Sequence, residues 1–292
     1  MKRILILGST GMLGTAVATN LEKMPIELLK SSRNSQLQTN EVLFDAKATN
    51  FSDFFRANGN FGYVINCIGT IKPHIDDSNQ IHVENAIQVN ALFPHELARQ
   101  SEIHGFKIIQ IATDCVFSGS KDEYSESDPH DPHDVYGKTK SLGEVNSSNF
   151  MNIRCSIIGP ENGRSTSLWE WVANQPSGAE INGYLDHHWN GVTTKVFAEI
   201  CRGIIENDKF VAGTHHLVPA DSVNKYELVS MIAENIGRRD IRVNPVNTDL
   251  PVNRTIATEF PEVNVALWKS AGYSSPPSIR EMVEGAALSS NL

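Results

Sequence analysis

Arg3-Ile-Leu-Ile-Leu-Gly8-Ser-Thr-Gly11-Met-Leu-Gly14 is the stretch of this 292-residue chain that decides the fold. A short apolar run ends in a cluster of glycines, and a helical pattern follows directly. Glycine lets the backbone turn tightly and approach a pyrophosphate, and the free N–H groups of a helix start stabilise its charge. The spacing is G-x-x-G-x-x-G, whereas the standard dinucleotide fingerprint is G-x-G-x-x-G. This order of strand, glycine turn and helix predicts a nucleotide site, with a plain strand-to-helix turn as the alternative.

The residues after this turn continue as alternating strands and helices. Helical patterns cover 50–57 and 78–103, and a further helix begins near Tyr136. The expected strands are the apolar runs 3–7, 26–31, 42–44, 63–69, 107–112 and 151–158. About six strands with short helical connections predict an α/β fold with a doubly wound, Rossmann-type parallel sheet.

The end of the second strand bears on the choice of dinucleotide. An NAD site places an acid there, whereas an arginine accommodates the 2′-phosphate of NADP. The sequence has Ser31-Ser32-Arg33 and no acid, and Glu27 lies near the beginning of the strand as a solvated residue. We therefore predict NADP(H) as the cofactor, with NAD(H) as the alternative. The residues expected at the cofactor are Gly8, Thr10, Gly11, Met12, Leu13, Gly14, Ser32, Arg33, Asp45, Cys67, Ile68, Gly69, Asn90, Tyr136 and Lys140.

The pattern of elements is less regular beyond residue 160. Helices are predicted near 165–175, 192–206, 222–237, 262–271 and 278–288. Strand-like pieces are predicted at 178–182, 213–218 and 240–244. We expect residues 1–160 to form an NADP-binding domain and residues 161–292 a smaller C-terminal α/β substrate lobe, some of whose elements rejoin the main domain.

Composition and charge exclude several classes of protein. The chain has 25 Lys and Arg against 34 Asp and Glu, a net charge of −9, and no basic run, which argues against a nucleic-acid partner. No stretch approaches the roughly 18 apolar residues of a membrane span. The 4 cysteines are scattered singly, which is typical of reduced core residues in a cytoplasmic protein. His187-His188 and His215-His216 are adjacent pairs that point to opposite sides of a strand, so we expect no metal site.

Tyr136 and Lys140 lie four residues apart at the start of a predicted helix. At that spacing the two side chains share one helix face. A free tyrosine has a pKa of about 10, which makes it a poor acid–base group at neutral pH, and a nearby ammonium lowers that pKa. Tyr136 is therefore a candidate proton donor, and Lys140 is a cation that would lower its pKa. A Tyr-x-x-x-Lys pair also arises by chance on solvated helix faces, so its meaning depends on the rest of the chain.

Several segments together resemble one known family. Besides the glycine turn, they are Ala112-Thr-Asp-Cys-Val-Phe-Ser-Gly119, Val135-Tyr-Gly-Lys-Thr-Lys-Ser-Leu-Gly-Glu144 and Asp186-His-His-Trp-Asn-Gly-Val-Thr-Thr194. The turn, Thr113 and the Tyr136 segment look like an extended short-chain dehydrogenase/reductase. More narrowly, the chain resembles the dTDP-4-dehydrorhamnose reductase family over nearly its whole length. The third segment departs from the sequence that is usual in the family, because it has His-His-Trp-Asn where a shorter, less aromatic stretch is expected.

The resemblance implies roles for three residues. Hydride passes from the nicotinamide to a ketone carbon while the Tyr136 hydroxyl protonates the developing alkoxide. Lys140 holds the nicotinamide ribose and lowers the pKa of the phenol, and Thr113 hydrogen-bonds the substrate oxygen. The alternative, non-catalytic roles are a strand cap for Thr113 and a surface charge for Lys140. Residues expected at the substrate are Thr113, Asp114, Trp189, Asn190 and Arg254. The guanidinium of Arg254 can clamp a diphosphate, and a surface arginine is its alternative.

One absence narrows the reaction type. Related enzymes that dehydrate sugar nucleotides carry an Asp-Glu pair after the threonine, because eliminating water needs an extra acid and an extra base. Here the pair is Asp114-Cys115, so simple carbonyl reduction is favoured over dehydration. Epimerisation by transient oxidation uses the same tyrosine and lysine and remains open.

The sequence therefore predicts NADPH-dependent reduction of a nucleotide-linked 4-keto-6-deoxy sugar, in the synthesis of a deoxysugar for a surface polysaccharide. The expected partner is the nucleotide-sugar substrate, a homodimer is compatible with the resemblance, and neither nucleic acid nor membrane is expected. One alternative is a reductase or epimerase of another nucleotide sugar. The other is a catalytically idle NADP-binding partner subunit, since one fold serves many functions.

Overall fold

The computed structural model describes residues 2–161 and 166–290. Its α-helices are α1 (Met12–Leu21), α2 (Phe51–Asn58), α3 (Gln80–Ala86), α4 (Phe93–His104), α5 (Val135–Leu142), α6 (Leu168–Ala173), α7 (Thr194–Glu206), α8 (Lys225–Asn235), α9 (Pro261–Ser270) and α10 (Ile279–Ser290). Its strands are β1 (Arg3–Leu7), β2 (Glu27–Ser32), β3 (Glu41–Leu43), β4 (Tyr63–Asn66), β5 (Lys107–Ala112), β6 (Phe150–Arg154), β7 (Ile157–Ile158), β8 (Glu180–Tyr184), β9 (His187–Trp189), β10 (Val192–Thr193), β11 (Gly213–His216), β12 (Val223–Asn224), β13 (Arg242–Val246) and β14 (Val252–Asn253). Shorter helical segments are η1 (Lys72–His74), η2 (Ile87–Leu92) and η3 (Asp114–Val116).

A parallel sheet forms the centre of the molecule. In the described part of the chain it has seven strands in the order β11-β6-β5-β4-β1-β2-β3, and every neighbouring pair is parallel. The predicted doubly wound α/β fold is therefore confirmed. The chain runs from β1 outward to β3 and then returns to β4 on the other side of β1. The strand order thus reverses between β1 and β4, which is where such sheets bind ligands.

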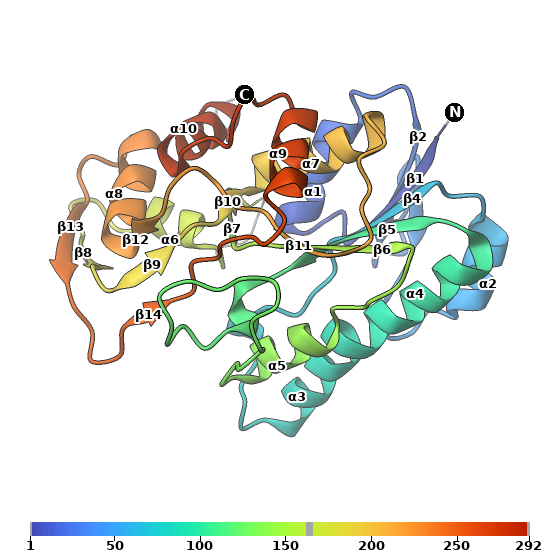
Figure 1. The fold of residues 1–292 in the computed structure, drawn as a ribbon, viewed down its shortest axis with the longest axis horizontal. Coiled ribbons are helices and arrows are strands. Elements are labelled where there is room, and N and C mark those ends of the chain that lie inside the picture. Colours follow the sequence, from blue (N-terminus) through green and yellow to red (C-terminus); the bar gives the residue numbers. More distant parts are fainter. Residues whose placement is uncertain (1, 162–165, 291–292) are drawn as a thin grey trace.

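Alternate side chains of β1 explain why both faces of the sheet are covered. Ile4 and Ile6 belong to one apolar cluster, which also contains residues of α1 and α7. Leu5 and Leu7 belong to a second cluster, built with aromatic residues of α2 and α4. Successive side chains of a strand point to opposite faces, so an unbroken apolar strand needs helices on both sides. Figure 1 shows α1, α7 and α9 on one face and α2 and α4 on the other.

The prediction of a single strand over 151–158 was wrong. β6 ends at Arg154, and β7 begins at Ile157 and pairs with β10 outside the central sheet. The carbonyl of Ser156 accepts a hydrogen bond of 2.9 Å from the N–H of Val192, which draws the chain away from β5. A strand-like stretch of eight residues cannot by itself reveal such a break, because both pieces keep strand-like composition.

The long helix predicted over 78–103 is interrupted by a π-helical segment. α3 ends at Ala86, and the π-helical segment η2 precedes α4. Pro94 has no N–H to offer the carbonyl of Asn90, so the regular ladder of hydrogen bonds is interrupted there. The side chain of Asn90 is buried at this turn.

The C-terminal half builds a smaller lobe beside the carboxyl ends of the strands (Figure 1). There β9 pairs with β12 and β14, and β8 pairs with β13. Other elements of this half lie in the main body: β11 pairs with β6 in the central sheet, α7 packs against α1, and α9 packs against α7. The boundary near residue 160 stays a prediction. No helix in residues 2–161 and 166–290 is long and apolar enough to cross a membrane.

Candidate active site

The glycine turn after β1 is packed too closely for a side chain at Gly14. Gly8 has a φ of +79°, a backbone conformation that favours glycine. A Cβ on Gly14 would overlap the carbonyl oxygen of Gly8, so α1 can pack this close to the turn only with glycine there. The N–H of Gly8 donates to the Ser31 hydroxyl at 2.8 Å, which fixes the turn against β2. The backbone is thus arranged for the close approach of a phosphate.

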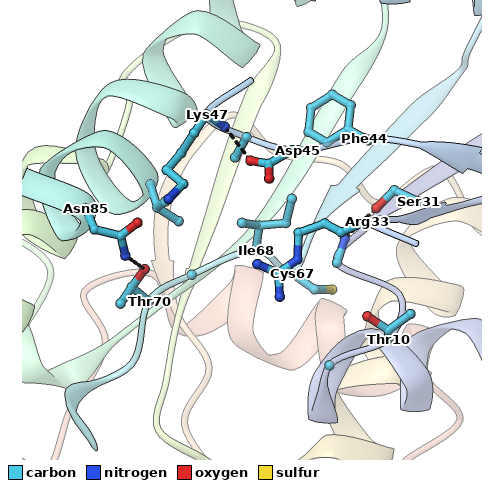
Figure 2. Close-up of a pocket in the computed structure, with 15 residues that line it drawn as sticks. Thr10, Ser31, Arg33, Phe44, Asp45, Lys47, Cys67, Ile68, Thr70 and Asn85 are labelled. Atoms are coloured by element: carbon cyan, nitrogen blue, oxygen red, sulfur yellow. Dashed lines mark hydrogen bonds between the residues drawn. The ribbon is translucent and has the colours of Figure 1, made fainter. Parts of the chain in front are cut away.

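A cavity opens beside this turn, at the ends of β1, β2 and β4. Its lining residues are Gly8, Thr10, Gly11, Ser31, Arg33, Phe44, Asp45, Ala46, Lys47, Cys67, Ile68, Gly69, Thr70, Asn85 and Val89. Figure 2 shows Arg33 reaching in from one side and Lys47 extending along the other, with Ile68 between them. The carboxylate of Asp45 accepts from the backbone N–H of Lys47 at 2.8 Å. Arg33 and Lys47 are two cations and Asp45 is one carboxylate, so the lining carries a net positive charge that suits an anionic ligand.

Ser32, expected at the cofactor, does not line this cavity. Its hydroxyl accepts a hydrogen bond of 3.0 Å from the N–H of Asn34, whereas the preceding residue, Ser31, points to the glycine turn. Alternation along β2 separates the two side chains, and the sequence alone did not fix which of them faces the ligand. Lys47 was also missed, because the cation lies two residues beyond the predicted Asp45.

A second cavity, of about 380 Å³, continues from the first. The two share the residues Gly11, Cys67, Ile68 and Gly69. The second is lined in addition by Met12 and Leu13 and by the expected catalytic residues Thr113, Tyr136 and Lys140. Sequence analysis missed other residues that line it, namely Ile71, Pro73, His74, Ile111, Ala112, Cys115, Cys155, Ser156, Ile157, Glu161, Thr166, Ser167 and Leu168. An elongated ligand can therefore extend from Arg33 to Tyr136 across the ends of β1 and β4.

Helix α5 carries Tyr136 to Thr113. The Asp134 side chain caps the helix by accepting from the N–H of Gly137 at 2.8 Å. A Cβ on Gly137 would overlap the Cys115 carbonyl, so glycine lets α5 approach η3 closely. Burial raises the pKa of Tyr136 above its ordinary value, and the neighbouring Cys115 adds to the increase, while a hydrogen bond with Thr113 opposes it. The downward shift expected from Lys140 is not found in the protein alone; the phenol stays protonated at neutral pH.

Lys140 is a buried cation whose charge depends on its neighbours. Its ammonium donates to the carbonyl of Ile111 at 2.9 Å. Burial lowers the pKa of Lys140 to about 8, and the carboxylate of Glu144, two residues beyond the end of α5, opposes that decrease. Lys140 is therefore mostly charged at neutral pH, with support from Glu144, and loses its charge as the pH rises through about 8.

Glu144 belongs to a buried network centred on Arg154. The guanidinium of Arg154 pairs with the carboxylate of Glu144 at 2.5 and 3.0 Å. It also donates to Nε2 of His216 at 2.6 Å and to Nε2 of His130 at 2.8 Å. Because arginine has no acceptor, both imidazoles accept through Nε2 and are neutral. Burial, followed by the charge of Arg154, lowers the pKa of His216 to about 4, in agreement with a neutral ring.

Two asparagines that were expected to contact ligands form side-chain hydrogen bonds with backbone groups of the protein. The side-chain oxygen of Asn90 accepts from the N–H of Thr70 at 2.8 Å, and its amide donates to the carbonyl of Thr70 at 2.9 Å. Asn190 makes the same pair of bonds with the backbone of Ile256, at 3.0 and 2.7 Å. Each amide is used on both sides within the chain. The two residues hold loops in position, and their contacts with a ligand stay a prediction.

A cluster of charges lies on the lobe side of Thr113. Asp114 is buried, and its carboxylate accepts from the Thr113 hydroxyl at 3.2 Å. Burial raises the pKa of Asp114, while the nearby charges of Arg254 and Lys225 oppose the increase. Arg254 donates from Nε to the carbonyl of Phe117 at 2.8 Å. Lys225 was not among the predicted residues, because a lysine in the first turn of a lobe helix gives no motif.

Trp189 and the histidine pairs complete the list of predicted positions. Trp189 is buried in β9, and the ammonium of Lys225 lies 5.3 Å from the centre of its ring. His216 is part of the Arg154 network, whereas His215 lies against Phe260. Among the described residues, no group of three or more His, Cys, Asp or Glu could hold a metal ion.

The sequence matches the RmlD substrate binding domain family over residues 1–288. It is 26% identical over 264 residues to methionine adenosyltransferase 2 subunit beta of Bos taurus, covering 86% of this chain and 77% of that protein. It is 24% identical over 247 residues to the spore coat polysaccharide biosynthesis protein SpsK of Bacillus subtilis (strain 168), covering 81% of this chain and 80% of that one.

The fold is similar to that of a solved structure, dTDP-4-dehydrorhamnose reductase from Bacillus anthracis str. Ames in complex with NADP. The TM-score is 0.77 at 19% sequence identity, and the match covers 99% of each chain. At this identity the likeness concerns the fold.

Proposed function

This chain belongs to the RmlD substrate binding domain family, and on that premise we propose that it is an NADPH-dependent reductase of a nucleotide-linked 4-keto-6-deoxy sugar. The observation that carries the proposal is that Thr113, Tyr136 and Lys140 line one cavity, which continues into the cavity beside the glycine turn. A hydroxyl acid, an orienting hydroxyl and a cation thus border a site long enough for a dinucleotide and a substrate.

The residues present fit NADP(H) as the cofactor. The glycine turn would hold its pyrophosphate, since Gly14 lets the start of α1 lie against the backbone of Gly8 and brings the free N–H groups of the helix start to the cavity. Arg33 and Lys47, with no carboxylate at the end of β2, suit a 2′-phosphate. Related structures with this fold contain NADP in one case and NAD in others, so NAD(H) stays the alternative.

The chemistry follows from the protonation states of the site. NADPH, when bound, supplies a hydride. Tyr136 keeps its proton at neutral pH because burial raises its pKa, so it can donate that proton to the oxygen of a ketone as that oxygen gains negative charge. Thr113 is close enough to hydrogen-bond the phenol and would orient the same oxygen. Lys140, while charged, stabilises the phenolate that remains.

Cys115 supports reduction over dehydration. It lines the cavity beside Thr113 and Tyr136, at the position where a dehydrating enzyme needs a carboxylate. Burial raises the pKa of its thiol to about 12, so it cannot replace a carboxylate as a base. Reduction or epimerisation of another nucleotide sugar uses the same tyrosine and lysine and is an outcome of the test below.

The test is NADPH oxidation with a panel of dTDP-, UDP- and GDP-linked 4-keto-6-deoxy sugars. We expect turnover with at least one member and formation of the corresponding 4-hydroxy sugar. NADPH binding without turnover of any ketone would contradict the reductase proposal. Product in which a stereocentre is inverted without net NADPH consumption would indicate an epimerase.

A second candidate is supported by the relative from Bos taurus, whose name describes a subunit of methionine adenosyltransferase 2. In that case the chain would bind NADP(H) and a partner enzyme without reducing a ketone. One measurement distinguishes the two candidates. A binding subunit would quench the fluorescence of NADPH when it binds, but it would never oxidise NADPH. The presence of Thr113, Tyr136 and Lys140 in one cavity favours the reductase.

A further inference from the structure

One wall of the catalytic cavity is a short exposed segment that follows β4. Ile71, Pro73 and His74 line the same cavity as Thr113 and Tyr136. The residues of this wall are exposed in the protein alone, and the apolar side chain of Ile71 is 38% exposed. Ligand cavities typically present such apolar surface, which the ligand buries when it binds. The wall therefore offers surface that a substrate beside Tyr136 would cover.

His74 is the polar side chain of this wall. Its backbone N–H donates to the carbonyl of Ile71 at 2.9 Å, which closes the tight turn of η1. Among the residues that the structure describes, its ring makes no hydrogen bond, ion pair or aromatic contact. By contrast, the rings of His130 and His216 both accept hydrogen bonds from Arg154. A neutral imidazole has one donor and one acceptor, a combination that suits a sugar hydroxyl.

Two side-chain contacts hold the wall against the start of α5. The ammonium of Lys72, which does not line the cavity, donates to the carboxylate of Asp134 at 2.7 Å. The N–H of Val135 donates to the carboxylate of Asp77 at 3.0 Å. Asp134 also caps α5, because it accepts from the N–H of Gly137 at 2.8 Å. One carboxylate therefore contacts both the wall and the helix that carries the catalytic tyrosine.

The beginning of the wall is fixed as well. Thr70 directly precedes Ile71, and its backbone exchanges two hydrogen bonds with the side chain of Asn90. Its hydroxyl accepts from the side-chain amide of Asn85 at 3.1 Å. The wall is thus held at Thr70 by α3 and η2, and further along by α5. Its position opposite the catalytic residues is set by these contacts and exists before any ligand binds.

We propose that His74 is a substrate-binding residue that hydrogen-bonds a hydroxyl of the sugar in a sugar nucleotide, and that Lys72 is a positioning residue that holds the wall through Asp134. The inference rests on the proposed function, in that it takes the ligand to be a sugar nucleotide. The sugar reaches this wall because its ketone must lie beside Tyr136, in the same cavity. The two apolar residues of the wall would pack against C–H groups of the sugar ring.

The experiment measures the dissociation constants of dTDP, dTDP-rhamnose, UDP and UDP-glucose with the NADP-loaded protein by calorimetry. The Kd of each diphosphate divided by that of its nucleotide sugar gives the contribution of the sugar. We expect His74→Leu to lower this ratio about fivefold for the nucleotide sugar that the wild type prefers, because one hydrogen bond is lost. The Kd of the free diphosphate should not change. His104→Leu, at the end of α4 and near the amino end of β5, is the control and should keep the wild-type ratio.

The ion pair that holds the wall has its own variants. Lys72→Met and Asp134→Asn each break it, and asparagine still caps α5 because its side-chain oxygen can accept from the helix start. We expect each to lower the same ratio about threefold, as is typical of a partly exposed ion pair, and the double variant to lower it no further. Lys121→Met breaks an ion pair of 2.6 Å with Asp128 elsewhere on the surface and should leave the ratio unchanged.

Four results would overturn the inference. An unchanged ratio in His74→Leu would show that the imidazole does not contact the sugar. An equal loss of affinity for a diphosphate and its nucleotide sugar would place His74 at the phosphates. Losses in Lys72→Met and Asp134→Asn that add in the double variant would show that the two residues act separately. If the wild type binds nucleotide sugars no better than diphosphates, the wall does not bind the sugar.

The test separates this inference from stability and from the proposed function. His74 and Lys72 are exposed, so their variants should unfold at the wild-type temperature. Turnover is not measured, so a protein that binds the sugar through His74 but reduces no ketone would refute the proposed function and keep the inference.

Discussion

Arg33 is the residue on which the choice between NADPH and NADH depends most directly. It reaches into the cavity beside the glycine turn, where Lys47 is the other cation (Figure 2). We expect Arg33→Ala to raise the KM for NADPH about tenfold and to leave that for NADH unchanged, because a charge-assisted hydrogen bond to the 2′-phosphate is lost. Steady-state kinetics with both cofactors checks this. Arg56→Ala, which removes an exposed arginine of α2, is the control, and an unchanged ratio of the two KM values would contradict the assignment.

Glu144 is the residue that keeps Lys140 charged. Because the pKa of Lys140 is about 8, its cation is complete below that pH and is lost as the pH rises through it, so turnover should decline on the alkaline side. Glu144→Gln removes the negative charge that opposes the effect of burial, so the pKa of Lys140 should fall further. We expect the alkaline limb of the kcat profile to move to lower pH by about one unit.

The matched control for Glu144→Gln is Glu96→Gln. Glu96 also pairs with an arginine, Arg99, but it lies partly exposed on α4, and its charge does not act on the pKa of Lys140. The control should leave the pH profile of the wild type unchanged. A profile of Glu144→Gln that coincides with that of Glu96→Gln would reduce Glu144 to a structural partner of Arg154.

The sequence predicted residues with a motif and missed those that depend on the fold. Thr113, Tyr136 and Lys140 were named from the order of strand end, helix start and spacing, and they line one cavity. Asn90 and Asn190 were named as ligand contacts, yet backbone groups use both sides of each amide. Which partner an amide finds depends on loops distant in sequence, so no local pattern could decide it.

The contact of α1 with the glycine turn is the element-scale feature that the nucleotide site requires. Gly14 allows the first turn of α1 to lie against the carbonyl of Gly8. We expect Gly14→Ala to lower the free energy of unfolding by about 3 kcal/mol, since α1 must move away from β1. The same displacement should abolish NADPH binding. Chemical denaturation and fluorescence titration measure the two effects.

Gly62→Ala is the control for this substitution. A Cβ on Gly62 would meet only the carbonyl of Arg3, at 3.8 Å, which is ordinary van der Waals contact. We expect stability within about 1 kcal/mol of the wild type and unchanged NADPH binding. If Gly14→Ala were equally well tolerated, the close packing of α1 on the turn would not be required.

Long elements were predicted well and short ones were not. The strand over 107–112 and the helices of the first half follow from apolar runs and periodicity. β10, β12 and β14 have two residues each, too few for any period to be visible. They form because the lobe folds back on itself, with β9 between β12 and β14. These short strands position Trp189 and the start of α8, so the substrate side of the site was the least predictable part.

At the scale of the whole molecule, both halves of the chain meet at the site. The sheet supplies the glycine turn, Thr113 and α5, and Thr166, Ser167 and Leu168 of the second half line the same cavity. The Arg154 network connects the two, because Nδ1 of His216 donates to the carbonyl of Ala257 at 2.5 Å, three residues after Arg254. The end of α5 and the loop that follows Arg254 are therefore both connected to one buried guanidinium.

The most direct test of this account compares NADPH binding and turnover in the wild type and Tyr136→Phe, with Tyr184→Phe, which removes a hydroxyl from an exposed tyrosine of the lobe, as the control. The account predicts that Tyr136→Phe binds NADPH like the wild type and reduces the sugar-nucleotide ketone at least about a hundredfold more slowly, because general acid catalysis contributes that much. Tyr184→Phe should reduce it at the wild-type rate. Full turnover by Tyr136→Phe, or NADPH binding by the wild type without turnover of any ketone in the panel, would contradict the central claim.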